Sequence, residues 1–136
     1  MDRLSQERRG WLMGRVKSKN TTTEMAVRRL VFGMGYRYRL HSKGLPGKPD
    51  LVFSRRNKII FVNGCFWHGH EDCKYGRLPK SRQEFWQAKI ERNRTRDKND
   101  IATLIAGGWQ VLVVWQCELK SLDVLSGKIH DFLEHE

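Results

Sequence analysis

One short loop holds most of the potential metal ligands of the chain, and it constrains the fold more than any other stretch. Residues 64–73 read Gly-Cys-Phe-Trp-His-Gly-His-Glu-Asp-Cys and follow an apolar run at 59–62. That run is short, β-branched and closed by Asn-Gly, which predicts a buried strand. Four residues separate Cys65 from His70 and two separate His70 from Cys73, which is the local ligand spacing of a zinc site.

A closed structural zinc site needs a fourth ligand. Cys117 follows a second apolar run at 111–115, and a site made of Cys65, His70, Cys73 and Cys117 would use all three cysteines of the protein. A cysteine can also serve as a small buried apolar residue, which is an alternative for Cys117. A disulfide would leave one thiol over. We predict a structural Cys3His zinc site.

The same loop holds a histidine and two aromatic residues that the zinc does not require. His68 and His70 lie two positions apart, so both could point at the metal. With His70 as the ligand, His68 is available for proton transfer near neutral pH. Phe66 and Trp67 are adjacent, so in an extended backbone one of them faces away from the core.

Length and charge favour one domain that binds a polyanion. The 136 residues suit a single core, and no apolar segment approaches the ~18 residues of a membrane span. The first residues lack the hydrophobic stretch of a signal peptide, which predicts a cytosolic protein in a reducing compartment. A net charge of +11 indicates a nucleic acid as the partner. A merely well-solvated surface is the alternative, but it would intersperse both signs.

The hydrophobic pattern divides the chain into an arm and one domain. Residues 1–20 are polar and basic and are expected to form an arm that orders on a partner, whereas residues 21–136 form a single domain. The expected order is α-β-β-β-α-β-α, a mixed sheet with helices on its faces. Helices are expected over residues 21–33 and 122–133. A third, long helix is expected to begin at a capping box at 81–84 and to end at Gly107. The expected strands cover 36–40, 51–53, 58–62 and 109–115, the last parallel to 58–62.

A set of motifs spread along the chain resembles one family. Pro49-Asp50 at the start of a strand is a weak signal alone. The motifs that accompany it are Pro46-Gly47-Lys48, the segment from Phe61 to His70, Phe85-Trp86, Lys89-Ile90, Asn93, Arg96-Asp97, Gly108-Trp109 and Val114-Trp115 with Cys117. In this order and spacing they resemble the very short patch repair (Vsr) mismatch endonucleases over essentially the whole chain. The resemblance implies an α/β, restriction-endonuclease-like mixed β-sheet flanked by helices, with a structural zinc site.

The resemblance also implies roles for individual residues. Asp50 would be the carboxylate ligand of a catalytic Mg²⁺, and the backbone carbonyl of Val62 would be a second ligand. His68 would be the catalytic histidine, Asp97 would support it, and Glu24 would lie near the active site. The zinc ligands would be the four derived above. Asn63 stands where some members have a second histidine, so a two-histidine mechanism is not expected here.

The DNA contacts implied by the resemblance lie in two regions. Phe66 and Trp67 match aromatic residues that wedge into the base stack, and Met13 is a candidate wedge from the other groove. Basic residues of the N-terminal region extend the expected DNA-binding surface, namely Arg15, Lys17 and Lys19.

The implied activity is Mg²⁺-dependent nicking of one DNA strand 5′ of the thymine in a T·G mismatch. Such mismatches arise when 5-methylcytosine deaminates. The expected protein is a bacterial, cytoplasmic, nucleoid-associated monomer with no membrane contact, and mismatch-repair proteins are candidate partners. Two alternatives stay open: a zinc-stapled DNA-binding module without activity, and a restriction-type nuclease that cuts unmodified DNA.

Overall fold

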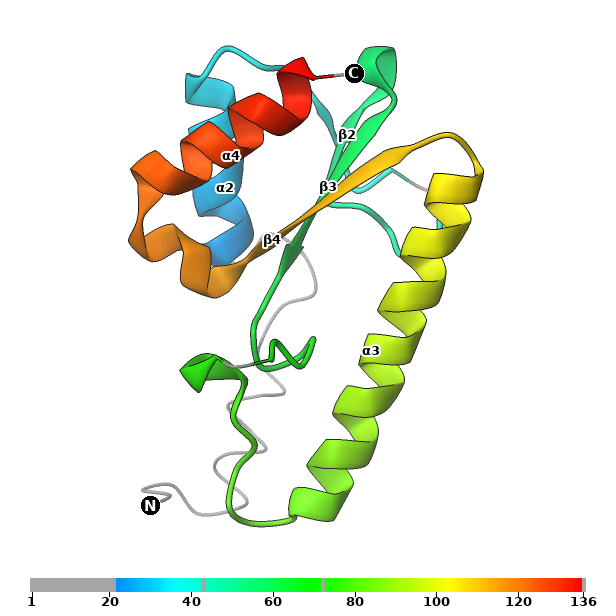
Figure 1. Cartoon of the computed structure of the whole chain (residues 1–136), viewed down its shortest axis with the longest axis vertical. Coiled ribbons are helices and arrows are strands. Elements are labelled where there is room, and N and C mark those ends of the chain that lie inside the picture. The colour runs from blue at the N-terminus through cyan, green and yellow to red at the C-terminus, as the bar shows by residue number, and fades with distance from the viewer. Residues whose placement is uncertain (1–21, 43, 72, 136) are drawn as a thin grey trace.

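The computed structural model describes residues 22–42, 44–71 and 73–135, and its centre is a mixed sheet of four strands in the order β1-β2-β3-β4 (Figure 1). The strands are β1 (Arg39–Leu40), β2 (Leu51–Phe53), β3 (Lys58–Asn63) and β4 (Gln110–Trp115). The helices are α2 (Thr22–Gly33), α3 (Gln83–Ala106) and α4 (Leu122–Glu134). Short 3-10 turns cover Ser54–Arg56, Lys74–Gly76 and Gln116–Lys120.

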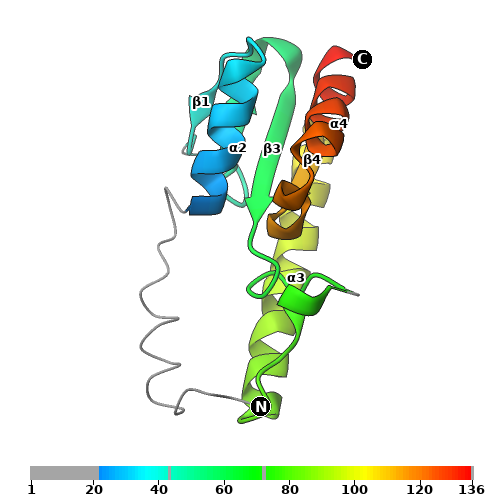
Figure 2. The ribbon, with the colours of Figure 1, turned by 90° about the vertical axis from the view of Figure 1, so that its left-hand side faces the viewer.

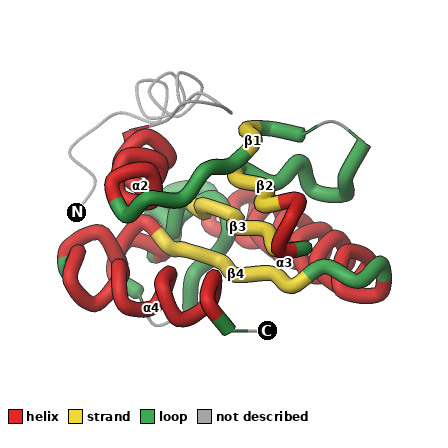
Figure 3. The backbone as a smooth tube through the Cα atoms, turned by 90° about the horizontal axis from the view of Figure 1, so that it is seen from above, coloured by secondary structure: helices red, strands yellow, loops and turns green. Residues whose placement is uncertain are grey.

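The sheet has the predicted topology. β1 pairs with β2 and β2 with β3 in antiparallel fashion, whereas β3 pairs with β4 in parallel because α3 carries the chain back between them. Helices α2 and α4 cover one face of the sheet and α3 covers the other (Figure 3). The mixed sheet flanked by helices that the sequence predicts is therefore confirmed. None of the helices within the described ranges is both long and apolar enough to cross a membrane.

Two local predictions were wrong. The strand expected over 36–40 is reduced to the two residues of β1, because β2 offers only three residues for pairing. The helix start predicted from the capping box at 81–84 was wrong, because Ser81 is not the N-cap. Helix α3 begins at Gln83, and its N-cap is Arg82 in a left-handed conformation (φ 56°) that makes no side-chain capping bond.

The N-terminal half of α3 extends past the sheet, alongside the loop that follows β3 (Figure 2). Asn93 on α3 donates a hydrogen bond of 2.9 Å to the carbonyl of Trp67 in that loop. This arrangement brings the helix and the loop together beyond the carboxyl end of β3.

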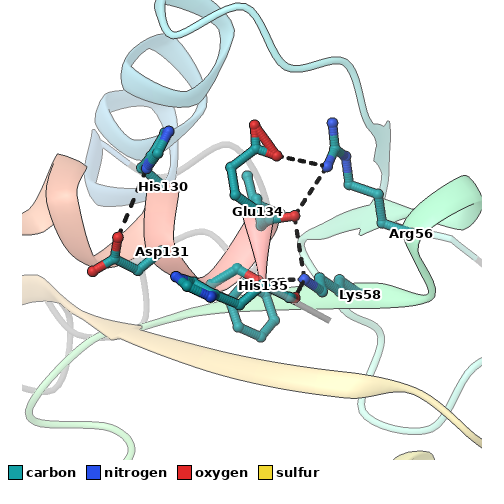
Figure 4. A network of polar contacts seen from close by, with 8 residues as sticks. Arg56, Lys58, His130, Asp131, Glu134 and His135 are labelled. Atoms are coloured by element: carbon teal, nitrogen blue, oxygen red, sulfur yellow. Dashed lines mark hydrogen bonds and ion pairs between the residues drawn. The ribbon is translucent and has the colours of Figure 1, made fainter.

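A buried lysine fixes the end of α4 against the sheet (Figure 4). Lys58 is 3% exposed, and its ammonium donates to the carbonyls of Phe132, Leu133 and His135. Arg56 donates to the carbonyl of Leu133 as well, at 3.0 Å. The last carbonyls of a helix have no partner inside the helix, and cations are favoured there.

We expect Lys58→Met to destabilise the fold by about 2–3 kcal/mol, because buried carbonyls would lose a charged donor. Urea unfolding measures the change. Lys128→Met is the matched control: Lys128 is 42% exposed in its side chain and pairs with Glu118, so its loss should cost less than about 1 kcal/mol. Equal effects of the two substitutions would contradict this role of Lys58.

Candidate functional site

Asp50 lies where β2 begins, and its side chain reaches across to β3. Its Oδ2 accepts a hydrogen bond of 2.7 Å from the backbone N–H of Val62. The N–H and C=O groups of one strand residue point toward the same neighbouring strand. The carbonyl of Val62 therefore points in the same direction as its N–H group, toward the strand beside which Asp50 lies.

The loop after β3 is coiled. The sequence analysis assumed an extended backbone when it placed one of Phe66 and Trp67 away from the core, and that assumption was wrong. The N–H of His68 donates to the carbonyl of Gly64 at 3.2 Å, and that of His70 to Cys65 at 2.9 Å. Gly69 has φ +61°, and a Cβ there would lie 2.5 Å from Ile90 of α3. Glycine thus allows the loop to turn tightly against the helix.

The turn places His68 against Asp97 of α3. The distance from His68 Nδ1 to Asp97 Oδ2 is 2.5 Å, and both side chains are about one quarter exposed, at 26% and 24%. A carboxylate only accepts hydrogen bonds, so Nδ1 carries the proton in the neutral ring and Nε2 is an acceptor.

Asp50, His68 and Asp97 line one open cavity of about 460 Å³ at the end of β3. Lys48, Arg96, Asp100 and Asn63 also line it. The sequence did not single out Lys48 or Asp100 as site residues. Lys48 has a left-handed backbone (φ 50°) directly before Pro49-Asp50, a conformation that is uncommon outside glycine and clusters at functional sites.

Glu24 lies next to Asp50 but does not itself line this cavity. It is 2% exposed, and its Oε2 is 2.8 Å from Nε2 of His41. Burial raises the pKa of Asp50 to about 7, and the neighbouring Glu24 adds to the rise, while the N–H of Val62 and His41 oppose it. A buried carboxylate beside a half-buried one favours a bound cation. No sequence pattern pointed to His41.

The predicted zinc ligands meet in space. The ligand atoms of Cys65, His70, Cys73 and Cys117 all lie within 4.8 Å of one another. The distance of 3.5 Å between Cys117 Sγ and His70 Nδ1 matches the edge of about 3.5 Å in a tetrahedron of zinc–sulfur and zinc–nitrogen bonds. Burial and the neighbouring thiols raise the pKa of Cys65 to about 12, and a bound metal ion would remove that proton. The group fits zinc.

Four aromatic side chains form a cluster beside the loop, which we call the aromatic cluster: Phe66, Trp67, Phe85 and Trp86. Phe66 and Trp67 are half-buried, and their rings meet edge to face at 5.2 Å. Trp86 of α3 lies 5.4 Å from Phe66 and 5.9 Å from Trp67. The sequence named Phe85 and Trp86 as part of the family motifs but gave them no role beside Phe66 and Trp67, so their place in this cluster was missed.

Basic residues surround the aromatic cluster. The ammonium of Lys89 lies 5.4 Å from the centre of the Trp67 ring, and the guanidinium of Arg82 lies 4.3 Å from that of Phe85. Aromatic rings beside cations are the usual means of holding unstacked bases next to a phosphate backbone. Met13, Arg15, Lys17 and Lys19, also predicted to contact DNA, lie outside the described residues.

Comparisons with known proteins agree on one family. The family model of the DNA mismatch endonuclease Vsr matches residues 1–75. A type II nicking enzyme, V.XorIIP of Xanthomonas oryzae pv. oryzae, is 56% identical over 133 residues, which are 98% of this chain and 97% of that protein. The DNA mismatch endonuclease Vsr of Escherichia coli is 39% identical over 114 residues, which are 84% of this chain and 72% of that protein.

One solved structure supports the fold. The catalytic domain of the homing endonuclease I-Bth0305I matches with a TM-score of 0.58 at 22% identity, over 83% of this chain and 94% of that domain. The likeness extends to the mixed sheet and its flanking helices.

Proposed function

Because this chain belongs to the Vsr family of DNA mismatch endonucleases and is therefore a DNA endonuclease, we propose that it nicks one strand 5′ of the thymine in a T·G mismatch. Its proposed cofactor is Mg²⁺. The observation that carries the proposal is that Asp50, His68 and Asp97 line one cavity at the end of β3. A monomer in the cytoplasm, with residues 1–20 as a DNA-binding arm and 21–136 as the nuclease domain, is part of the same proposal.

Asp50 and the carbonyl of Val62 are the residues that would hold Mg²⁺, since both present oxygen to the same side of β3. Hard cations of this kind prefer oxygen ligands. When bound there, Mg²⁺ would neutralise charge on the phosphate and lower the pKa of a water molecule. Lys48, at the rim of the same cavity, adds a positive charge for the phosphate.

His68 takes the proton of the attacking water in this proposal. Its Nδ1 is held by Asp97, so Nε2 is the atom that accepts the proton. A general base in this position contributes typically ~10²–10⁴-fold to the rate. Asp97 orients the ring and stabilises the imidazolium that forms.

The zinc has a structural part in the proposal. Four protein ligands leave no open position for a substrate or water. His70 is two residues after His68, so the zinc holds the loop that carries the catalytic histidine. Cys117 follows β4, so a zinc ion held by these residues would link the carboxyl ends of the two parallel strands.

Trp67 is proposed to wedge into the DNA beside the mismatch, with Phe66 next to it. A wedge must offset an unstacking cost of about a few kcal/mol per base step. A mispaired T·G step is cheaper to open than a matched pair, so a wedge favours mismatched DNA.

Trp67→Ala is expected to lose most T·G-specific nicking while melting within a few degrees of the parent protein, because the ring is half-buried and outside the two core clusters. Nicking rates and thermal melts measure both effects. Trp109→Ala is the control, since Trp109 packs against the core on the α3 face. It should lose stability and keep its nicking per folded molecule. A large fall in the melting temperature of Trp67→Ala, with unchanged nicking per folded molecule, would show that Trp67 serves to pack the fold instead.

A nicking assay separates this proposal from a DNA-binding module without activity. A labelled T·G duplex is incubated with Mg²⁺ and the parent protein or His68→Ala. The parent should nick one strand, whereas His68→Ala should bind the duplex and nick it at least about 10²-fold more slowly. Tight binding by the parent without any nicking in Mg²⁺ would favour the binding module.

A further inference from the structure

Three side chains from separate parts of the fold meet in one cluster: Glu24 of α2, His41 directly after β1, and Asp50 directly before β2. Their ligand atoms lie within 4.8 Å of one another. We refer to them as the carboxylate–histidine cluster. Of these, only Asp50 lines the cavity that also holds His68 and Asp97.

We propose that the carboxylate–histidine cluster is a divalent-cation site that selects Mn²⁺ over Mg²⁺, with His41 as its nitrogen ligand. The inference rests on the proposed function, since Asp50 also belongs to the proposed Mg²⁺ site. It extends that function by adding Glu24 and His41 as ligands beside Asp50 and by naming the cation that this donor set binds more tightly.

The geometry holds the three groups in place. His41 Nε2 lies 2.8 Å from Glu24 Oε2, close to the separation of about 3 Å between adjacent ligand atoms in an octahedral site with bonds near 2.1 Å. The N–H of His41 donates to the carbonyl of Asp50 at 3.3 Å, which ties the two backbones together. His41 has φ 46°, a conformation that a non-glycine residue adopts only where its surroundings support it.

The charge of the cluster favours a cation. Glu24 is 2% exposed and lies beside the half-buried Asp50, so two carboxyl groups share one position largely shielded from solvent. Arg28 lies 3.6 Å from Glu24 Oε2 and balances part of this charge. The side chain of His41 is 17% exposed, so an ion can reach the cluster from solvent.

The donor set decides which cation fits. Mg²⁺ requires oxygen ligands and gives up water reluctantly, so an imidazole nitrogen suits it poorly. Imidazole suits transition metals, and among these Mn²⁺ also accepts a set made mostly of carboxylates. One nitrogen with two carboxylates therefore favours Mn²⁺ over Mg²⁺.

Mn²⁺ binding to the zinc-loaded, DNA-free protein tests the inference. Titration followed by electron paramagnetic resonance should show about one Mn²⁺ per chain, bound at least ~10-fold more tightly than Mg²⁺ in competition. His41→Gln keeps an amide that can bond to Glu24 but removes the imidazole, and it should weaken Mn²⁺ binding at least ~10-fold with little change for Mg²⁺. His130→Gln is the control, because His130 is 59% exposed on α4, and it should bind like the parent.

A measurement on the parent protein covers the case in which His41→Gln folds poorly. Pulsed electron paramagnetic resonance of bound Mn²⁺ should show coupling to an imidazole nitrogen. His68→Ala should retain this nitrogen coupling. Absent nitrogen coupling, or equal Mn²⁺ affinity of the parent and a folded His41→Gln, would overturn the inference. T·G nicking in Mg²⁺ by the same preparations separates the two proposals. If nicking is intact but the nitrogen coupling is absent, or His41→Gln binds Mn²⁺ as tightly as the parent, only the Mn²⁺ site is overturned. If nicking is absent but the nitrogen coupling is present, only the nicking function is overturned.

Discussion

Asp50→Asn is expected to reduce nicking by roughly 10³-fold or more, because a metal ion stabilises the transition state for phosphate hydrolysis by several kcal/mol. Asp50 accepts the N–H of Val62, and asparagine can keep that bond through its carbonyl oxygen. The fold should therefore survive. Binding to a T·G duplex should change little, because phosphate contacts supply most of the affinity. Single-turnover nicking and a binding titration measure both quantities.

Asp123→Asn is the control for this substitution, since Asp123 is exposed at the start of α4. It should nick like the parent. Turnover retained by purified Asp50→Asn would remove Asp50 from the proposed metal site.

The same substitution should change how stability depends on pH. Burial raises the pKa of Asp50 from 3.8 to about 7 in the folded protein. Between these values the folded protein keeps a proton that the unfolded chain has lost, so this group's contribution to stability is complete below pH 4 and is lost as pH rises through 7. Melts in Mg²⁺-free buffer should show the parent losing stability relative to Asp50→Asn as pH rises from about 4 to 7. If the melting temperatures of the parent and Asp50→Asn changed with pH in parallel, the raised pKa of Asp50 would be contradicted.

Removal of the zinc is expected to have the largest effect on the fold. Structural zinc sites contribute free energies on the order of 10 kcal/mol in small domains. Cys117→Ser removes the ligand that follows β4, so we expect loss of about one zinc per chain and a steep fall in melting temperature. Metal analysis and thermal melts measure the two effects.

Cys117→His is the matched variant, because it restores a fourth ligand of a type that zinc accepts. It should recover part of the zinc content and of the melting temperature. A folded, active protein without zinc would contradict a structural role for the ion.

The fold was predictable because its signals are local. The apolar runs that became β3 and β4 were visible, and the long helix between them fixed their parallel pairing. The meeting of the four proposed zinc ligands was predictable because three of them share one loop and the chain has a single further cysteine. The helix start predicted from the capping box was wrong because Arg82 adopts a left-handed conformation, which the residue pattern at 81–84 does not reveal.

The site was less predictable from the residues themselves. Asp50, His68 and Asp97 were selected through a family resemblance, and their roles remain proposals. His41 carries no periodicity or motif, and its meeting with Glu24 depends on how α2 packs beside the end of β1. Trp86 was recognised only as part of a family motif, since its contact with Phe66 arises only once the loop coils against α3. Such contacts join elements far apart in the sequence, which local patterns do not specify.

The most direct test of mismatch-specific nicking compares two duplexes that differ only in one base pair, T·G or T·A, under single turnover with Mg²⁺. The product is mapped on both strands. We predict a nick 5′ of the mispaired thymine, on that strand alone, with T·G cut at least about 10²-fold faster than T·A, because opening a matched step costs a few kcal/mol more. Equal cutting of the two duplexes would contradict the proposal and favour a restriction-type nuclease.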